Sequence, residues 1–129
     1  MATALILAPA GCSLGADEEP QPATGAPREI GAVVQRLERA IARRDFESVC
    51  ENLFTADARE HAGGADCPRL LRSAAGAVRD PRIEVRAIDL EGDAATVRVR
   101  TGARGRATVG TTLRLRRQRG EWRIEGLRD

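Results

Sequence analysis

The chain is 129 residues long, with 31% charged and 42% hydrophobic residues, a composition typical of a soluble globular domain. Its 21 basic residues, all of them Arg, nearly balance 19 acidic ones, which argues against binding of nucleic acid over the whole surface. Two Phe, one Trp and no Tyr offer too few aromatic faces to stack single-stranded bases. We therefore expect no nucleic-acid partner.

A short apolar run, residues 2–11, opens the chain and ends at Cys12. The run is far shorter than the ~20 residues that span a membrane, and its length is typical of the apolar part of an export signal. Ala10-Gly11-Cys12 resembles the core of a bacterial lipoprotein signal, in which a small residue precedes the lipidated cysteine. The resemblance implies a protein lipidated at Cys12 and anchored to the cell membrane or envelope, facing outside the cytoplasm. The alternative is a chance cysteine on a cytoplasmic domain.

Residues 13–28 are rich in Pro, Gly and acidic residues and contain no aromatic residue. Such a segment buries too little apolar surface to fold, so we expect a disordered tether with a reach of roughly 20 Å. Residues 29–129 remain for one folded domain. A domain of that size buries about 60–70% of the surface of its unfolded chain, and its core is modest.

Helical periodicity is present from residue 29 to residue 44. Asp45 is a typical N-cap for a second helix, and Asp66 for a third, which opens with Cys67 and Pro68. Residues 55–65 give no clear element, because Gly63-Gly64 interrupts the pattern. The apolar stripes comprise Ile30, Val33, Val34, Leu37 and Ile41 in the first helix, Phe46, Val49, Cys50 and Leu53 in the second, and Cys67, Leu70, Leu71, Ala74 and Val78 in the third.

From residue 82 the apolar spacing changes from helical to alternating, which predicts four β-strands joined by short turns. A change of phase near Ala87 predicts a β-bulge. The strands form an antiparallel meander with one apolar face, which the helices would cover. The fold class is therefore α+β, with N-terminal helices packed on a four-stranded antiparallel curved sheet. The predicted inward residues of the third strand are Ala107, Val109, Thr111, Leu113 and Leu115.

Three segments carry a resemblance to a known superfamily: residues 30–37 of the first helix, residues 42–50 around Asp45, and residues 121–127 of the last strand. Together with the order of elements, they look like the NTF2-like (SnoaL-like) superfamily, specifically its small exported bacterial versions, over residues 29–127. The resemblance implies a cone in which a bent sheet and its helices enclose a cavity. Members range from enzymes to binding or assembly modules, and sheet-mediated homodimers are common. The resemblance therefore transfers a fold and no activity.

Cys50 and Cys67 both lie on apolar helix stripes, so each should face the core. In an exported protein they are expected to form a disulfide, which would contribute about 3 kcal/mol to stability. The alternative is two buried free thiols. Two cysteines and a single histidine leave too few ligands for a closed zinc site, and we expect no metal and no cofactor.

His61 is the only histidine. One hypothesis makes it a general base oriented by Glu60 or Asp57. Its neighbours are polar and end at Gly63-Gly64, which favours an exposed position without a catalytic role. No nucleophile with an adjacent base is evident, because the two core cysteines are expected to be oxidised. We therefore assign no catalytic residue.

The polar face of the predicted sheet is rich in arginine. One interpretation is a cationic patch that contacts anionic lipid headgroups or an acidic partner. The other is a solvated face with cross-strand Arg–Glu pairs, which the absence of lysine throughout the chain makes the more ordinary one. The patch consists of Arg98, Arg100, Arg114 and Arg116, with Arg123, Glu84 and Glu125 expected on the same face.

These observations lead to one preferred function and one alternative. The preferred function is that of a membrane-tethered, non-enzymatic lipoprotein whose domain binds a small ligand or an envelope protein. The alternative is an NTF2-like enzyme, of isomerase or dehydratase type, that acts on a small organic substrate. An enzyme would need ionisable groups inside the cavity. The predicted inward faces carry Val, Leu, Ile, Ala, Trp and Thr111 but no Asp, Glu or His, so binding is favoured.

Overall fold

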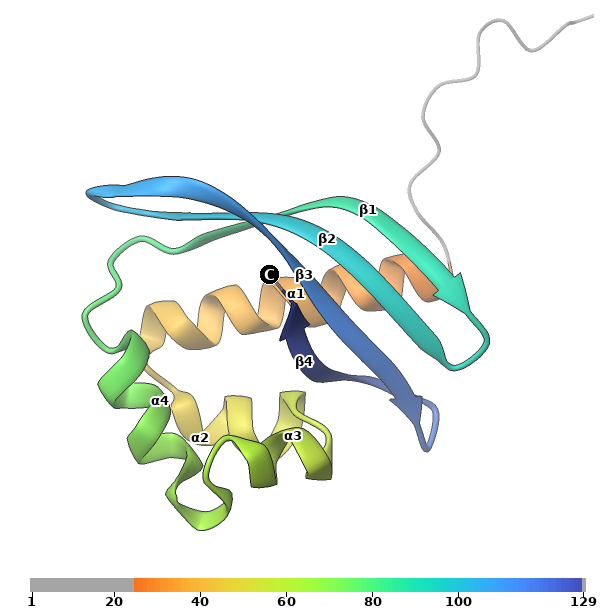
Figure 1. The fold of residues 1–129 in the computed structure, drawn as a ribbon, viewed down its shortest axis with the longest axis horizontal. Coiled ribbons are helices and arrows are strands. Elements are labelled where there is room, and N and C mark those ends of the chain that lie inside the picture. Colours follow the sequence, from red (N-terminus) through yellow and green to blue (C-terminus); the bar gives the residue numbers. More distant parts are fainter. Residues whose placement is uncertain (1–24, 129) are drawn as a thin grey trace, which may run out of the picture.

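The computed structural model describes residues 25–128 and places a helical layer against one face of a curved sheet (Figure 1). Cys12 and residues 13–24 of the predicted tether lie outside the described residues. The helical layer consists of α1 (Ala26–Arg43), α2 (Phe46–Ser48), η1 (Val49–Leu53), α3 (Ala56–His61), η2 (Gly64–Asp66) and α4 (Cys67–Ala75). The sheet consists of β1 (Arg82–Glu91), β2 (Ala94–Ala103), β3 (Arg106–Gln118) and β4 (Glu121–Arg128). The predicted α+β class is confirmed.

Helix α1 begins at Ala26, earlier than the predicted residue 29, because Pro27 fits the first turn, where a missing N–H costs nothing. It ends at Arg43 and is followed by the C-cap Arg44, whose φ of 57° is left-handed. The N–H of the next residue, Asp45, donates to the Ala40 carbonyl at 2.9 Å. The Asp45 carboxylate then accepts from the Ser48 N–H at 3.2 Å, which confirms this residue as the predicted N-cap.

Thr55 starts an additional helix, α3, in the segment for which no element was predicted. Its hydroxyl accepts from the Ala58 N–H at 3.1 Å, while its own N–H donates to the Ile124 carbonyl at 2.9 Å. The residue is almost completely buried. A capping threonine therefore joins the helical layer to β4.

Asp66 occupies the N-cap position of α4, as predicted, but its side chain makes no capping hydrogen bond. Its carboxylate caps no backbone N–H and instead lies 3.5 Å from the Arg69 guanidinium. The physical reason is that Asp66 ends the short helix η2 with a ψ of 0°, whereas a capping residue has extended backbone. The predicted stripe of α4 also needs correction, since Leu70 is 42% exposed and Ala74 is exposed. Helix α4 packs through Cys67 and Leu71 of the predicted stripe, together with Ala75.

The four strands form one antiparallel sheet in the order β1-β2-β3-β4. The register shifts between Val85 and Ala87, which confirms the predicted bulge, and shifts again between Thr101 and Ala103 in β2. Because bulges increase local twist and bend, they curve the sheet over α1, as Figure 1 shows. At the edge strand β1, the Glu38 carboxylate of α1 accepts from the Ile83 N–H at 2.7 Å.

The core lies between α1, η1 and the concave face of the sheet. Its largest fully buried side chains include Ile30, Leu53, Val97 and Leu115. Val109 and Ala107 lie on the predicted inner face, where they line a hollow, but both are exposed, Val109 by 56%. The reason is that the end of the β2–β3 hairpin extends past the end of α1 and receives little cover (Figure 1).

A disulfide joins Cys50 of η1 to Cys67 at the start of α4, across a sequence separation of 17 residues. Both cysteines are almost fully buried. Reduction of this bond should lower the free energy of unfolding by about 3 kcal/mol, because a loop of this length is no longer closed in the unfolded chain. Urea unfolding of a Cys12→Ser variant with and without reductant would measure the loss. An unchanged midpoint would contradict it.

Candidate functional site

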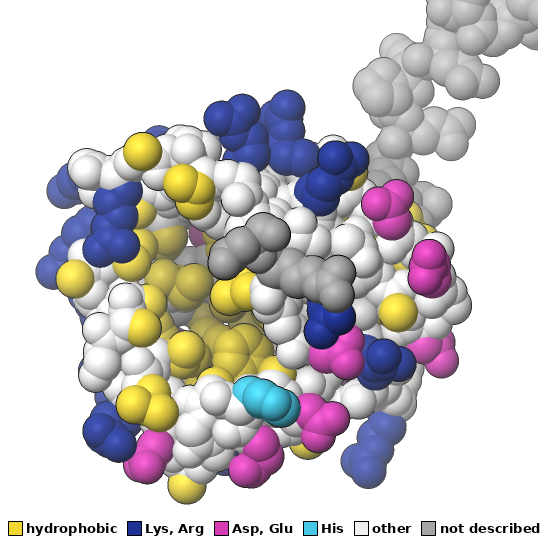
Figure 2. All heavy atoms as spheres, viewed as in Figure 1, with side chains coloured by type: hydrophobic (Ala, Val, Ile, Leu, Met, Phe, Trp, Pro, Cys, Tyr) yellow, Lys and Arg dark blue, Asp and Glu magenta, His cyan; other side chains and the backbone are white. Residues whose placement is uncertain are grey.

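A cavity of about 210 Å³ lies between the sheet and the helices. Figure 2 shows hydrophobic side chains inside a hollow in this face of the molecule. The walls come from α1, α2, η1, α4 and all four strands, so the whole fold shapes the cavity. The lining residues are Leu37, Ile41, Phe46, Val49, Phe54, Leu71, Ala75, Ile83, Val99, Thr101, Thr111, Leu113, Ile124 and Leu127.

The cavity walls are apolar except for the side chains of Thr101 and Thr111. No ionisable side chain is among the lining residues. An apolar cavity of about 150 Å³ stays dry and binds benzene, so a hollow of this size and chemistry suits an apolar molecule better than water. The inward position predicted for Thr111 is confirmed.

The Phe46 wall of the cavity is braced from outside by α4. The Arg72 guanidinium lies 5.8 Å from the centroid of the Phe46 ring and 3.2 Å from the carboxylate of Glu47. The backbone N–H of Glu47, and then Arg72, lower the pKa of the Glu47 carboxyl below its usual value. The pair is largely solvent-exposed, so it orients Arg72 over the ring more than it stabilises the fold.

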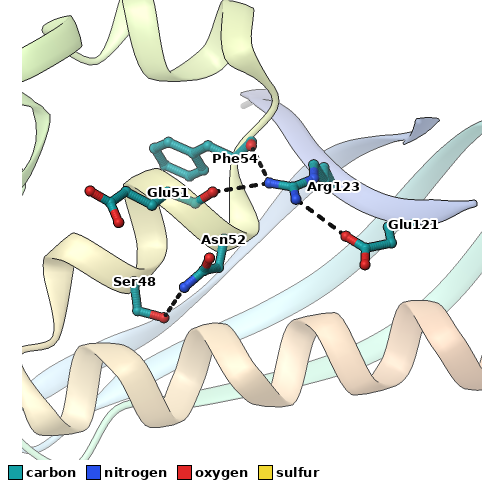
Figure 3. A network of polar contacts seen from close by, with 6 residues as sticks. All are labelled: Ser48, Glu51, Asn52, Phe54, Glu121 and Arg123. Carbon is teal, nitrogen blue, oxygen red and sulfur yellow. Dashed lines mark hydrogen bonds and ion pairs between the residues drawn. The ribbon is translucent and has the colours of Figure 1, made fainter. Parts of the chain in front are cut away.

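The Phe54 wall depends on Arg123 of β4 (Figure 3). The guanidinium donates to the carbonyls of Glu51 at 3.1 Å and of Phe54 at 3.4 Å, and it pairs with Glu121 at 3.2 Å. These carbonyls lie at and just beyond the end of η1, where helical C=O groups lack intrahelical partners. Arg123 was expected to project with the arginine patch. Arg123 does pair with Arg116 of that patch across the strands, and its guanidinium reaches past the edge of the sheet to hold the helical layer.

The arginine patch itself lies on the outer face of β2 and β3, away from the cavity. The register pairs Arg100 with both Glu84 and Gly110, and Arg98 with Thr112. Arg98 and Arg100 are exposed, and the Arg116 guanidinium lies 3.3 Å from the Glu125 carboxylate. The structure thus brings the predicted patch together and shows the carboxylates expected among the arginines. What the patch contacts stays a prediction.

His61 lies in the last turn of α3 and is exposed. Its Nδ1 is 2.8 Å from the backbone carbonyl of Asp57, and neither the Glu60 nor the Asp57 carboxylate has a hydrogen bond to the ring among those of residues 25–128. The ring does not line the cavity. Within the same residues, no group of three His, Cys, Asp or Glu side chains could hold a metal ion. The hydrogen bond of His61 is therefore a local one to the backbone of its own helix.

No family model and no curated protein matches this sequence. Among solved structures, an NTF2-like protein of unknown function from Silicibacter pomeroyi DSS-3 shares 21% identity at a TM-score of 0.61, over 78% of this chain and 91% of that one. The protein has the NTF2-like fold. A second such protein of unknown function, from Shewanella baltica OS155, shares 16% identity at a TM-score of 0.56, over 81% of this chain and 94% of that one.

A de novo designed NTF2 fold protein is also similar, with 15% identity, a TM-score of 0.55, and coverage of 81% of this chain and 87% of the design. The fold can therefore be built without an inherited activity. The likeness at these identities concerns the fold alone, and the function has to be argued from the cavity.

Removal of the Arg123 contacts should destabilise the helical layer. Arg123→Gln is expected to lower the free energy of unfolding by about 1–2 kcal/mol, because two carbonyls at the end of η1 lose a charged donor. Arg98→Gln, the same substitution on the outer face, should change it by less than about 0.5 kcal/mol. Urea unfolding of both variants tests the prediction, and equal effects would refute it.

Proposed function

We propose that the protein is an exported, membrane-tethered lipoprotein whose NTF2-like domain binds a small apolar ligand. The observation that carries the proposal is the cavity of about 210 Å³, in which only two threonines interrupt the apolar walls. Atoms that face an empty hollow lose dispersion contacts, and a ligand of fitting shape restores them. Because a cavity of about 150 Å³ holds benzene, this one suits a compact molecule of roughly ten carbon atoms.

Binding fits the cavity walls better than catalysis does. An isomerase or dehydratase needs a proton donor or acceptor within hydrogen-bond reach of its substrate. The two threonines in the walls present no polar atom to the cavity, and no carboxyl, imidazole or amine lines it. We therefore place the enzyme second, and we propose a small ligand rather than an envelope protein as the occupant of the cavity.

The tether rests on the sequence and on the disulfide. Cys12 follows an apolar run and precedes polar residues, as in a lipoprotein signal. The Cys50–Cys67 bond suits an oxidising compartment outside the cytoplasm. In the part of the chain that the structure describes, no helix has the length and apolar character to cross a membrane. Attachment would then depend on acyl chains at Cys12.

The arginine patch would lie near anionic headgroups in such an arrangement, with each arginine close to the surface adding to the attraction. This contact is part of the proposal. Loss of binding to anionic vesicles on changing Arg98, Arg100, Arg114 and Arg116 together to Gln would support it, and unchanged binding would remove it.

Camphor, a compact ten-carbon compound, should bind in the cavity with a Kd on the order of 0.1 mM. Titration followed by NMR should shift the methyl signals of Val99 and Leu113, which line the walls. Val99→Phe should weaken binding at least tenfold, because the added ring occupies the hollow.

Leu90→Phe is the matched control, since Leu90 is 44% exposed and does not line the cavity. It should leave camphor affinity unchanged. Saturable binding that Val99→Phe does not weaken would place the ligand elsewhere, and no binding at millimolar camphor would refute the proposal.

Mass spectrometry of the protein from its native host tests the tether. A membrane species that starts at Cys12 and carries added acyl mass is expected, and Cys12→Ala should move the protein to the soluble fraction. A soluble, unprocessed wild-type chain would overturn the lipoprotein assignment without affecting the cavity.

A further inference from the structure

A second hollow of about 240 Å³ lies beside the cavity under the β2–β3 hairpin, and we call it the hairpin groove. The two hollows share four wall residues, so they lie against one another. The shared residues are Ile41, Ala75, Ile83 and Thr101. The groove adds further apolar side chains, among them Val78, Ala107 and Val109. The uncovered hairpin end therefore extends the apolar surface beyond the cavity.

Unlike the cavity, the hairpin groove has charged residues in its wall. Arg82 and Arg106 line it, and no Asp or Glu does. Arg106 pairs with Ala103, which is buried, and residues directly opposite in an antiparallel pair share one face of the sheet. Arg106 thus belongs to the inner face, at the open end of the groove. Figure 2 shows Arg side chains gathered beside the hollow, over the tip of the β2–β3 hairpin.

An apolar cavity beside a groove with a cationic end would receive a compact ligand and an unbranched one in different ways. A compact molecule would fill the cavity and leave the groove empty. An unbranched chain would occupy both hollows, with one end among apolar walls and the other beside a guanidinium. A carboxylate at that end would gain a charge-assisted hydrogen bond, which is stronger than one between neutral groups.

We propose that the cavity and the hairpin groove together bind one unbranched fatty acid, with its tail in the cavity and its carboxylate at Arg106. The inference rests on the proposed function and names the ligand class of the same site. Partial exposure of the groove suits the head of such a ligand, because the carboxylate keeps contact with water while the chain leaves it. The shape and the charge of the two hollows agree on this ligand.

A chain-length series tests the inference. The full chain with Cys12→Ser and its disulfide formed would be titrated with octanoate, decanoate, dodecanoate and tetradecanoate, each below its micelle concentration, in a calorimeter. Each added methylene should tighten Kd roughly fourfold until both hollows are full, because each buries a further apolar group. The methyl ester of each acid should bind at least tenfold more weakly than the acid.

Two variants separate the groove from the cavity. Arg106→Gln should bring acid and ester to equal affinity, whereas Arg98→Gln on the outer face should change neither. Ala107→Phe, which alters the groove alone, should abolish the gain from the longer chains and leave camphor binding unchanged.

The outcomes distinguish the inference from the proposed function. Camphor binding without a chain-length effect, or without a difference between acid and ester, would overturn the fatty-acid inference and leave a compact ligand in the cavity. Absence of binding by both camphor and the acids would overturn both proposals. The inference would be supported if the affinity rises with chain length and with the charge of the acid, and if Ala107→Phe removes the first effect and Arg106→Gln the second.

Discussion

The structure depends on the junction between the segment after η1 and the edge of the sheet. Phe54 forms a parallel bridge with Ile124, and the Thr55 N–H donates to the carbonyl of that same residue at 2.9 Å. Arg123 completes the junction from the sheet side, through two carbonyls at the end of η1. Since Phe54 and Ile124 also line the cavity, the same contacts that fix the helical layer set the spacing of the cavity walls. A shift of this junction would alter every other wall.

Away from this junction, other contacts hold the helices of the layer to one another. The disulfide holds the start of α4 to η1, and the Arg44 guanidinium donates to the Gly76 carbonyl at 2.8 Å, just after α4 ends. Both contacts join helices to one another and neither reaches the β2–β3 hairpin. The hairpin end is held instead by the segment that follows α4, since the Arg104 N–H donates to the Arg79 carbonyl at 2.8 Å and the Arg104 guanidinium pairs with the Asp80 carboxylate. The cavity and the groove are the space that this arrangement leaves.

The periodicity of hydrophobic residues alone was sufficient to predict most of the fold. Hydrophobic spacing identified α1, the strands and the bulge at Ala87, since those features follow from which side of each element is buried. The errors share another cause. The Asp66 side chain makes no capping bond because η2 precedes it, and Leu70 and Val109 are exposed because no element covers them. Arg123 pairs with Arg116 of the patch, but its guanidinium extends to η1. Each depends on contacts between distant segments. The cavity could not be located or sized from the sequence, because its volume depends on how side chains from all the packed elements fit together.

The contact of Glu38 with the Ile83 N–H has a consequence for assembly. An edge strand offers unpaired backbone groups on which a strand of another molecule can be added, and a carboxylate here occupies the first of them on β1. Charged side chains, Glu84 and Arg86 among them, follow along the same strand and further discourage such pairing. At the other edge, Phe54 and Thr55 already pair with β4. Copies of this protein would thus resist edge-to-edge pairing into a continuous sheet, and contact between copies would involve the faces of the domain instead.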